Sequence, residues 1–262
     1  MKKYVTRRQR KELREKQRKR IAIALAVIAF ICLVGAIFSV VLHNSKKGAR
    51  MSGLGRKGSL SIVEEDPGSI PDYSGEDYIV LNHGVPCFNS WDLNNITGEN
   101  FSNLDSMGRC GPAIAMLDRS MMPSGKRGEI GQIKPSGWVQ NKYEGIVDAK
   151  PPFLYNRSHL IAYALTGQND NELNLITGTR YMNATTMLPW EEMVMRYLDN
   201  TDNHVLYRVT PYFRDNELLA RGVEMEAYSV EDAGKSICYH VFIFNVQPGI
   251  IIDYATGENW AE

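Results

Sequence analysis

Residues 155–160 read YNRSHL, and residues 174–191 read NLITGTRYMNATTMLPWE. In an extended segment, side chains two residues apart emerge on the same face, so we expect Arg157 and His159 to point to the same side. A neutral histidine can take a proton from water near pH 7. An arginine beside such a base suits a reaction on a phosphodiester, because its guanidinium can bind a non-bridging oxygen as charge builds on phosphorus.

Three residues of the second segment supply polar groups of the kind that a metal centre needs. Asn183 can offer an amide oxygen to Mg²⁺, a hard ion that keeps most of its waters and needs few protein ligands. Glu191 follows eight residues later and can hold those waters, while Asn174 precedes Asn183 by nine residues and can orient the histidine or a phosphate. Taken singly, the asparagines fit turns or caps and the glutamate fits the first turn of a helix. The order and spacing of all three together indicate a site.

These segments resemble the DNA/RNA non-specific endonuclease family of ββα-metal nucleases, and within it the membrane-bound DNA-entry nucleases of Gram-positive bacteria. The resemblance runs from about Tyr78 to Trp260 and includes VQPGIIIDYATGEN at residues 246–259. It implies an α+β fold in which a ββα-metal core packs against an antiparallel sheet. It also implies hydrolysis of DNA, and of RNA, to 5′-phosphate products with Mg²⁺ as cofactor, or Mn²⁺ in its place.

The resemblance further implies a role for each residue of the site. His159 matches the general base, and Arg157 matches the arginine that stabilises the transition state. Asn183 matches the sole direct protein ligand of Mg²⁺, and Glu191 matches the glutamate that orients water on the ion. Asn174 begins the strand that precedes these residues and is included among the catalytic residues.

Two residues depart from the family's Asp-Arg-Gly-His motif. Asn156 stands in place of the aspartate, and Ser158 stands in place of the glycine. If the aspartate only shapes the turn, asparagine is a mild change; if its charge tunes the histidine, activity falls. Because the base, the arginine and the metal ligand are all present, we interpret both departures as variation rather than as proof of inactivity.

The remaining elements follow from apolar runs and turn residues. We expect a polar, turn-rich segment over 89–98, a strand or short helix over 111–122 and a loop over 123–137. Proline suits the first turn of a helix, which indicates a helix from Pro189 to Asn200. The other expected elements are a strand at 78–81, a strand end at 153–155, a short helical segment at 160–165, a strand at 174–180, and three long strands at 205–213, 218–230 and 237–246. Turns at 214–216 and 232–234 indicate that these three form an antiparallel meander.

The zero net charge of the 262-residue chain hides a strong asymmetry. Residues 1–20 carry 11 Lys and Arg against 2 Glu, whereas residues 78–262 carry 14 Lys and Arg against 22 Asp and Glu. An acidic domain predicts weak, salt-sensitive binding of nucleic acid through a local basic groove. The candidates for substrate contact are Lys126, Arg127 and Arg180, joined by Arg157, Lys134 and Arg196. Lys126 and Arg127 also fit an ordinary exposed loop.

Residues 21–42 form an apolar run of 22 residues without a charge, which is long enough to span a bilayer. The basic segment 1–20 would stay on the cytoplasmic side and direct the domain at 78–262 outward, with 43–77 as a flexible linker. We therefore predict a single-pass cell-membrane protein with an extracellular catalytic domain. A cleaved signal peptide is the alternative, but its apolar region is usually shorter.

The cysteines and the remaining histidines give weaker signals. Outside the apolar run, Cys87, Cys110 and Cys238 allow one disulfide without indicating which pair forms it. His43, His83, His204 and His240 each lack a group of partners at a suggestive spacing, so we interpret them as structural.

Two other classes of function remain open at this level. A non-catalytic surface protein that captures DNA would bind nucleic acid without cutting it. A hydrolase of another kind has neither a serine nucleophile elbow nor an H-E-x-x-H pattern to support it. For a nuclease, the sequence leaves DNA uptake with an uptake machinery, degradation of extracellular DNA and nutrient scavenging as alternative roles.

Overall fold

A computed structural model describes residues 70–125 and 127–262. The predicted basic segment 1–20, the apolar run 21–42 and residues 43–69 of the predicted linker lie outside the described residues, as does Lys126. Among the helices of the described part, none is long and apolar enough to cross a membrane.

Six strands form one antiparallel sheet in the order β1-β8-β7-β6-β3-β2. Their bounds are β1 Tyr78–Val80, β2 Gly98–Phe101, β3 Ala113–Leu117, β6 Val205–Tyr212, β7 Gly222–Ser229 and β8 Cys238–Phe244. Strands consecutive in the chain pair from β6 through β8, which confirms the predicted meander. Strand β1 pairs with the other edge of β8. The strands of the main sheet that come first and last in the chain are therefore neighbours.

Strand β7 begins four residues later than the apolar run predicts. The backbone amides of Leu218 and Leu219 donate to the carbonyls of Ala255 and Tyr254. These residues therefore pair with the C-terminal segment instead of extending the ladder with β6. That segment ends in a small hairpin of β9 (Ile250–Ile252) and β10 (Asn259–Ala261).

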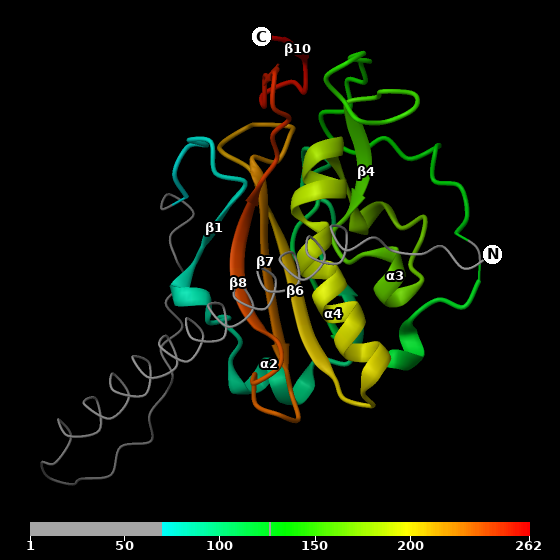
Figure 1. The fold of residues 1–262 in the computed structure, drawn as a ribbon, viewed down its shortest axis with the longest axis vertical. Helices are drawn as coiled ribbons and strands as arrows, with labels where there is room; N and C mark the ends of the chain where they lie inside the picture. The colour runs from blue at the N-terminus through cyan, green and yellow to red at the C-terminus, as the bar shows by residue number, and fades with distance from the viewer. Residues whose placement is uncertain (1–69, 126) are drawn as a thin grey trace, which may run out of the picture. The chain divides into compact units, whose positions relative to one another are not determined.

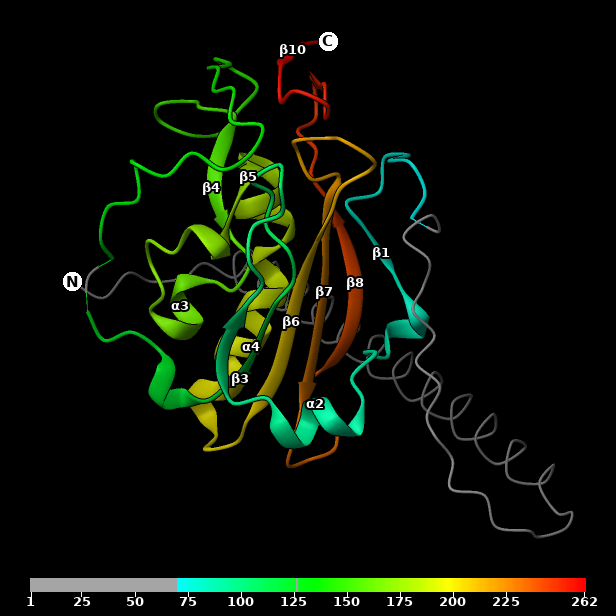
Figure 2. The same ribbon diagram turned by 180° about the vertical axis from the view of Figure 1, so that it is seen from behind.

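The two faces of the sheet are covered differently because alternate residues of a strand point to opposite sides. Val223, Met225 and Ala227 of β7 face the main core, where Val194 and Leu198 of helix α4 (Leu188–Asn200) pack against them. Figures 1 and 2 show α4 along this side of the sheet beside β6. The opposite face carries a smaller cluster made by Leu81, Phe242 and Phe244.

The central segment folds as two strands followed by a helix. Strands β4 (Tyr155–His159) and β5 (Leu175–Thr179) pair antiparallel, with His159 opposite Leu175. A π-helical turn, η5 (Met182–Thr186), leads into α4, whose first turn contains Pro189. The strand predicted at 174–180 and the helix predicted from Pro189 are therefore confirmed to within a residue or two at each end. Helix α3 (Tyr163–Thr166) is the short helical segment expected between the strands.

The N-terminal third of the domain holds a helix that the sequence did not predict and a strand that the sequence left undecided between strand and helix. The polar segment 89–98 contains helix α2 (Ser90–Asn95). Asn89 caps it by accepting from the amides of Trp91 and Asp92, and the Asp92 carboxylate accepts from the amide of Asn89. The ambiguous segment 111–122 is strand β3 followed by a 3₁₀ turn at Arg119–Met121. A further 3₁₀ turn is Asn82–Gly84, and another, Glu172–Asn174, lies later in the chain directly before β5.

The disulfide that the sequence left open does not form. Neither Cys110 nor Cys238 is bridged, so no two of the three cysteines outside the apolar run are joined. Cys110 is instead buried, with its thiol directed at the carbonyls of Glu172 and Leu175.

Candidate active site

A cleft of about 920 Å³ opens where β4, η5 and α4 meet the loop that precedes β4. Most of the predicted site residues line it, namely Arg127, Arg157, His159, Arg180, Asn183 and Glu191. Asn174 is not part of this lining, and Lys126 lies outside the described residues. The ββα arrangement therefore brings residues from β4, η5 and α4 to one concave surface.

His159 lies at the end of β4 and is only 6% exposed. Its Nε2 lies 2.8 Å from the carbonyl oxygen of Asn169, and a carbonyl can only accept, so Nε2 carries the hydrogen. The lone pair is therefore on Nδ1, to which the guanidinium of Arg127 donates at 3.1 Å. The contact with Asn169 fixes the tautomer, and the two contacts together fix the orientation of the ring.

Burial is the main reason why the pKa of His159 falls to about 4, and the nearby charge of Arg127 lowers it further. The hydrogen bonds to the backbone at Asn169 and Gln168 oppose this change only in part. At neutral pH the imidazole is therefore uncharged and able to accept a proton at Nδ1 once Arg127 has moved away.

Asn174 holds the chain immediately after His159. Its Oδ1 accepts from the amide of Ile161 at 2.8 Å, and its Nδ2 donates to the carbonyl of Ile161 at 2.9 Å. The amide of Leu160 donates to the backbone carbonyl of Asn174 at 2.9 Å. Since the side chain is fully buried, both ends of its amide are used to fix the backbone, and no part of it reaches the cleft lining.

Arg157 is anchored by the loop in front of β4. Its Nε donates to the carbonyl of Ile133, its Nη2 donates to the carbonyl of Gly131 at 2.6 Å, and its guanidinium lies 4.3 Å from the ring centre of Trp138. Partial burial lowers its pKa from the ordinary value. Two of the five N–H donors of the guanidinium are used in this way, which leaves the others for an anionic group in the cleft.

Asn183 lies in the π-helical turn, where its side chain meets β4. Ser158 donates from Oγ to Oδ1 of Asn183 at 2.9 Å. An amide oxygen has two lone pairs, so this bond orients the group and leaves one lone pair available. Gly178 makes room for the serine, because a Cβ at Gly178 would lie 2.6 Å from Cβ of Ser158 and 2.7 Å from Cε of Met182.

Glu191 is 8% exposed and lies in the first turn of α4. Burial raises its pKa to about 7, and the neighbouring charge of Glu192 contributes to the rise. A buried carboxylate of this kind is stabilised in its charged form by a nearby cation. Together with the amide oxygen of Asn183 it makes an oxygen donor set in the same cleft, which fits a hard divalent ion such as Mg²⁺ or Mn²⁺.

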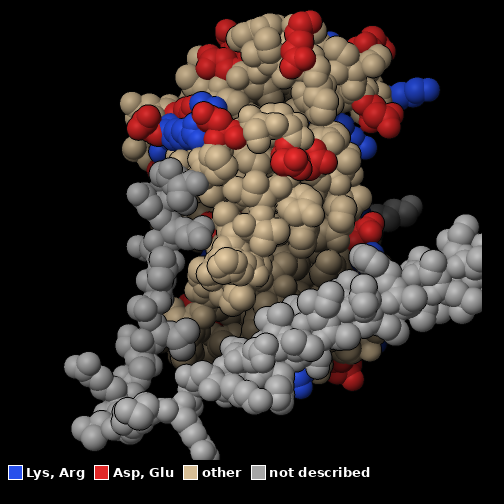
Figure 3. Space-filling model, turned by 60° about the vertical axis from the view of Figure 1, so that its left-hand side comes forward, with Lys and Arg blue, Asp and Glu red and all other residues tan. Residues whose placement is uncertain are grey.

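The predicted basic groove is local. Arg180 and Arg127 line the cleft, but Arg196 is exposed and forms a 3.1 Å ion pair with Glu192 on the surface of α4. On the face shown in Figure 3, Lys and Arg side chains form small separate groups among Asp and Glu side chains. Among the described residues, the positive side chains that line the cleft are Arg127, Lys150, Arg157 and Arg180.

Several residues of the site gave no signal in the sequence. Trp138 stacks on Arg157 from a loop without periodicity, and Asn169 acts through its backbone carbonyl, which any residue could supply. Arg127 was expected at the substrate but not at His159, from which it is separated by 32 residues. No spacing rule connects residues that meet across loops of this length.

Comparison with known proteins shows which family and which relatives this chain is similar to. The family described as DNA/RNA non-specific endonuclease matches residues 90–231. A deoxyribonuclease of Streptococcus dysgalactiae subsp. equisimilis is 35% identical over 109 residues, which cover 40% of this chain and 32% of that protein. The matched part is thus about a third of the length of that relative.

Solved structures of bacterial nucleases share the fold. NucA from Streptococcus agalactiae with a magnesium ion bound superposes with a TM-score of 0.63 and 26% identity, over 74% of this chain and 93% of that one. The Sda1 nuclease with a bound zinc ion gives a TM-score of 0.55 and 28% identity, over 64% of this chain and 83% of that one. The similarity therefore extends over nearly the whole of NucA.

Proposed function

Since the chain belongs to the DNA/RNA non-specific endonuclease family, we propose that it hydrolyses phosphodiester bonds of DNA, and of RNA, at the cleft around His159 and leaves 5′-phosphate ends. The observation that carries the proposal is the state of His159. Its imidazole is neutral, its tautomer is fixed by the Asn169 carbonyl, and Nδ1 lies in a cleft that also holds Asn183 and Glu191.

His159 acts as the general base. A water proton moves to Nδ1 as the water oxygen forms its bond to phosphorus and the bond from phosphorus to the 3′ oxygen breaks. Arg127 has to leave Nδ1 before this step, and a substrate phosphate offers its guanidinium a charged alternative. When Arg127 leaves, one of the causes that lower the pKa of His159 is removed, so the imidazole becomes a stronger base as the substrate binds.

The arginines bind the phosphate. Arg157 is held in place by the carbonyls of Gly131 and Ile133 and by Trp138, so its remaining donors are presented without a large loss of side-chain entropy. Arg180 lines the same cleft. Guanidinium donors aimed at the equatorial oxygens stabilise the charge that grows on them in the transition state.

Asn183 and Glu191 would hold the divalent ion, for which we propose Mg²⁺, or Mn²⁺ in its place. Such an ion stabilises negative charge on the departing oxygen. Asn183 contributes its amide oxygen, oriented by Ser158, and Glu191 contributes a carboxylate that holds water around the ion. The magnesium in NucA supports this choice, whereas the zinc in Sda1 makes the identity of the ion a matter for measurement.

We place the enzyme on the outer side of the cell membrane. Support comes from the sequence alone, namely the apolar run 21–42 behind the basic segment 1–20, with 43–77 as the tether. From there the enzyme would act on extracellular DNA, either in degradation or next to an uptake machinery. Alkaline phosphatase fused after residue 262 should be active on intact cells, and its inactivity would contradict this orientation.

The decisive experiment is a nuclease assay with the purified full chain on duplex DNA, single-stranded DNA and RNA, in Mg²⁺ and in EDTA. His159→Ala should reduce cleavage by roughly 10²- to 10⁴-fold. His204→Ala is the matched control, because His204 is half exposed, pairs with Glu231 and is not among the residues that line the cleft. Unchanged cleavage by His159→Ala would refute the assignment, and binding without cleavage by the unaltered chain would support the alternative of non-catalytic DNA capture.

A further inference from the structure

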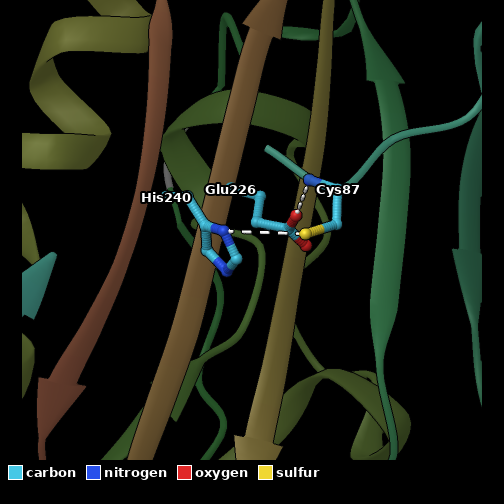
Figure 4. A group of neighbouring side chains, drawn as sticks. All are labelled: Cys87, Glu226 and His240. Atoms are coloured by element: carbon cyan, nitrogen blue, oxygen red, sulfur yellow. Dashed lines mark hydrogen bonds between the residues drawn. The ribbon is translucent and has the colours of Figure 1, made fainter. Parts of the chain in front are cut away.

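A second group of chemically reactive side chains lies on the sheet face that carries Phe242 and Phe244. Cys87 belongs to the connection between β1 and α2, while Glu226 and His240 face each other across β7 and β8. Figure 4 shows the three side chains converging above these strands. One ligand atom from each, a sulfur, a carboxylate oxygen and a ring nitrogen, lies within 4.8 Å of the other two.

His240 is oriented in the way that metal-binding histidines usually are. The ring is 1% exposed, and its Nε2 is hydrogen-bonded to the carboxylate of Glu224. Its Nδ1 points to Sγ of Cys87 at 3.8 Å and to the carbonyl of Val85 at 3.2 Å. A carboxylate on the far ring nitrogen fixes the ring and makes the near nitrogen a better ligand, which is the arrangement found behind many zinc-bound histidines.

Glu226 is also 1% exposed and has capacity for a further bond. Its Oε2 pairs with Arg208 at 2.6 Å, and its Oε1 accepts from the backbone amide of Cys87 at 2.6 Å. A carboxylate oxygen has more than one acceptor direction, so Oε1 can still face a cation. Because Arg208 pairs with Glu226, the negative charge of the nearby Glu224 is left to be balanced by another positive group.

We propose that Cys87, Glu226 and His240 form a binding site for a thiophilic divalent ion of the Zn²⁺ class. Zinc bonds of about 2.3 Å to sulfur and 2.0 Å to nitrogen put these two atoms roughly 3.5 Å apart in a tetrahedral site, close to the observed 3.8 Å. Water would complete the fourth position. None of the three residues lines the cleft around His159, so the site is separate from the proposed catalytic centre.

The donor types distinguish this site from the cleft. A thiolate and an imidazole select zinc-like ions, whereas the amide and carboxylate oxygens of Asn183 and Glu191 suit Mg²⁺. Binding releases the protons of the Cys87 thiol and of Nδ1 of His240. Without an ion, burial would lower the pKa of His240, but Glu224 and Glu226 outweigh it and raise the pKa, so the imidazolium balances their charge.

An ion at this position would fasten the β1–α2 connection to the sheet. Other contacts also hold the connection to the sheet. The amide of Leu81 donates to the carbonyl of His240, Sγ of Cys238 lies 3.8 Å from the carbonyl oxygen of Gly84, and the ring of Phe88 lies beneath the guanidinium of Arg208. Cys87 is separated from Glu226 by 139 residues, so a bond through the metal would join distant parts of the domain. The effect is on stability rather than on catalysis.

Cobalt(II) gives the sharpest test, because a thiolate bound to it produces a charge-transfer band that oxygen ligands do not. The full chain, reduced and freed of metal with EDTA, should develop this band and saturate at about one Co²⁺ per chain. Cys87→Ser should abolish the band, while Cys238→Ser and Cys32→Ser, which alter other cysteines, and Asn183→Ala, which alters the cleft, should retain it. Absence of the band in the unaltered chain, or its persistence in Cys87→Ser, would overturn the proposal.

A second measurement guards against misfolding of the variant. Cys87→Ser should keep the circular dichroism spectrum and the nuclease activity of the unaltered chain in saturating Mg²⁺. Zn²⁺ should raise the melting temperature of the unaltered chain and of Cys238→Ser, but not that of Cys87→Ser. An equal rise in all three proteins would place the ion elsewhere and refute the site.

Discussion

Glu191→Gln should uncouple the binding of a divalent ion from the uptake of a proton. Burial raises the pKa of this carboxyl to about 7. In the metal-free protein, about nine in ten molecules are therefore protonated at pH 6 and about one in ten at pH 8. Because a cation favours the charged form, ion binding should release about 0.9 proton at pH 6 and about 0.1 at pH 8. The apparent affinity should fall by up to about tenfold for each pH unit below 7.

Binding of Mn²⁺, followed through the paramagnetic resonance signal of the free ion between pH 5.5 and 8, measures this dependence directly. The Cys87→Ser background limits binding to the cleft. His159 has a pKa of about 4 and stays neutral throughout this range, so it adds nothing to the slope. Below pH 7 the unaltered cleft should approach one decade per pH unit, and Glu191→Gln should be nearly flat. Equal slopes in the two proteins would show that Glu191 does not respond to the ion.

Two further substitutions test the residues that support the site. Ser158→Ala removes the 2.9 Å hydrogen bond that orients Asn183, so the Mg²⁺ concentration for half-maximal cleavage should rise by about 2- to 13-fold, the equivalent of about 0.5–1.5 kcal/mol; an unchanged or lower concentration contradicts this role. Asn174→Ala leaves the amide and carbonyl of Ile161 without partners in the core and should lower the free energy of unfolding by about 1–3 kcal/mol in urea denaturation. A stable Asn174→Ala variant that loses activity would instead point to a direct part in catalysis.

The ββα segment could be predicted from the sequence because the residues that specify it act locally. Branched residues between Asn174 and Arg180 favour a strand, and Pro189 favours the first turn of a helix, as found in β5 and α4. The spacing of Asn183 and Glu191 then follows from the π-helical turn that joins these two elements. Local preference was sufficient where each residue's environment depends on near neighbours.

Contacts across long loops, in contrast, could not be predicted from the sequence. Arg127 reaches His159, and Trp138 reaches Arg157, only because the loop before β4 folds back over the strand. The Arg157 side chain donates to the backbone carbonyls of Gly131 and Ile133 in this loop, and any residue could supply such a carbonyl. Helix α2 is a contrasting case, since its capping pair of Asn89 and Asp92 is readable in the sequence, but its length falls below that of most amphipathic patterns.

The structure gives a specific role to Ser158, the residue that departs from the glycine of the family motif. As a replacement for glycine it places a side chain where the family motif has none, and Gly178 on the paired strand is the position that leaves room for it. The hydroxyl is directed at Asn183, the same group that would hold the ion. A substitution at the third position of the motif therefore need not weaken the site when a neighbouring residue accommodates it.

His240 shows where more could have been inferred from sequence, since it has grouped partners in the fold although no sequence spacing suggested them. In a hairpin, residues at equal distances from the centre of the turn face each other across the two strands. The predicted turn at 232–234 is centred on residue 233, and Glu226 and His240 each lie seven residues from it, as the observed pairing shows. A buried acid opposite a histidine in apolar strands already indicates a polar group with a specific purpose. Cys87, which comes from a distant loop, could be added only from the folded chain.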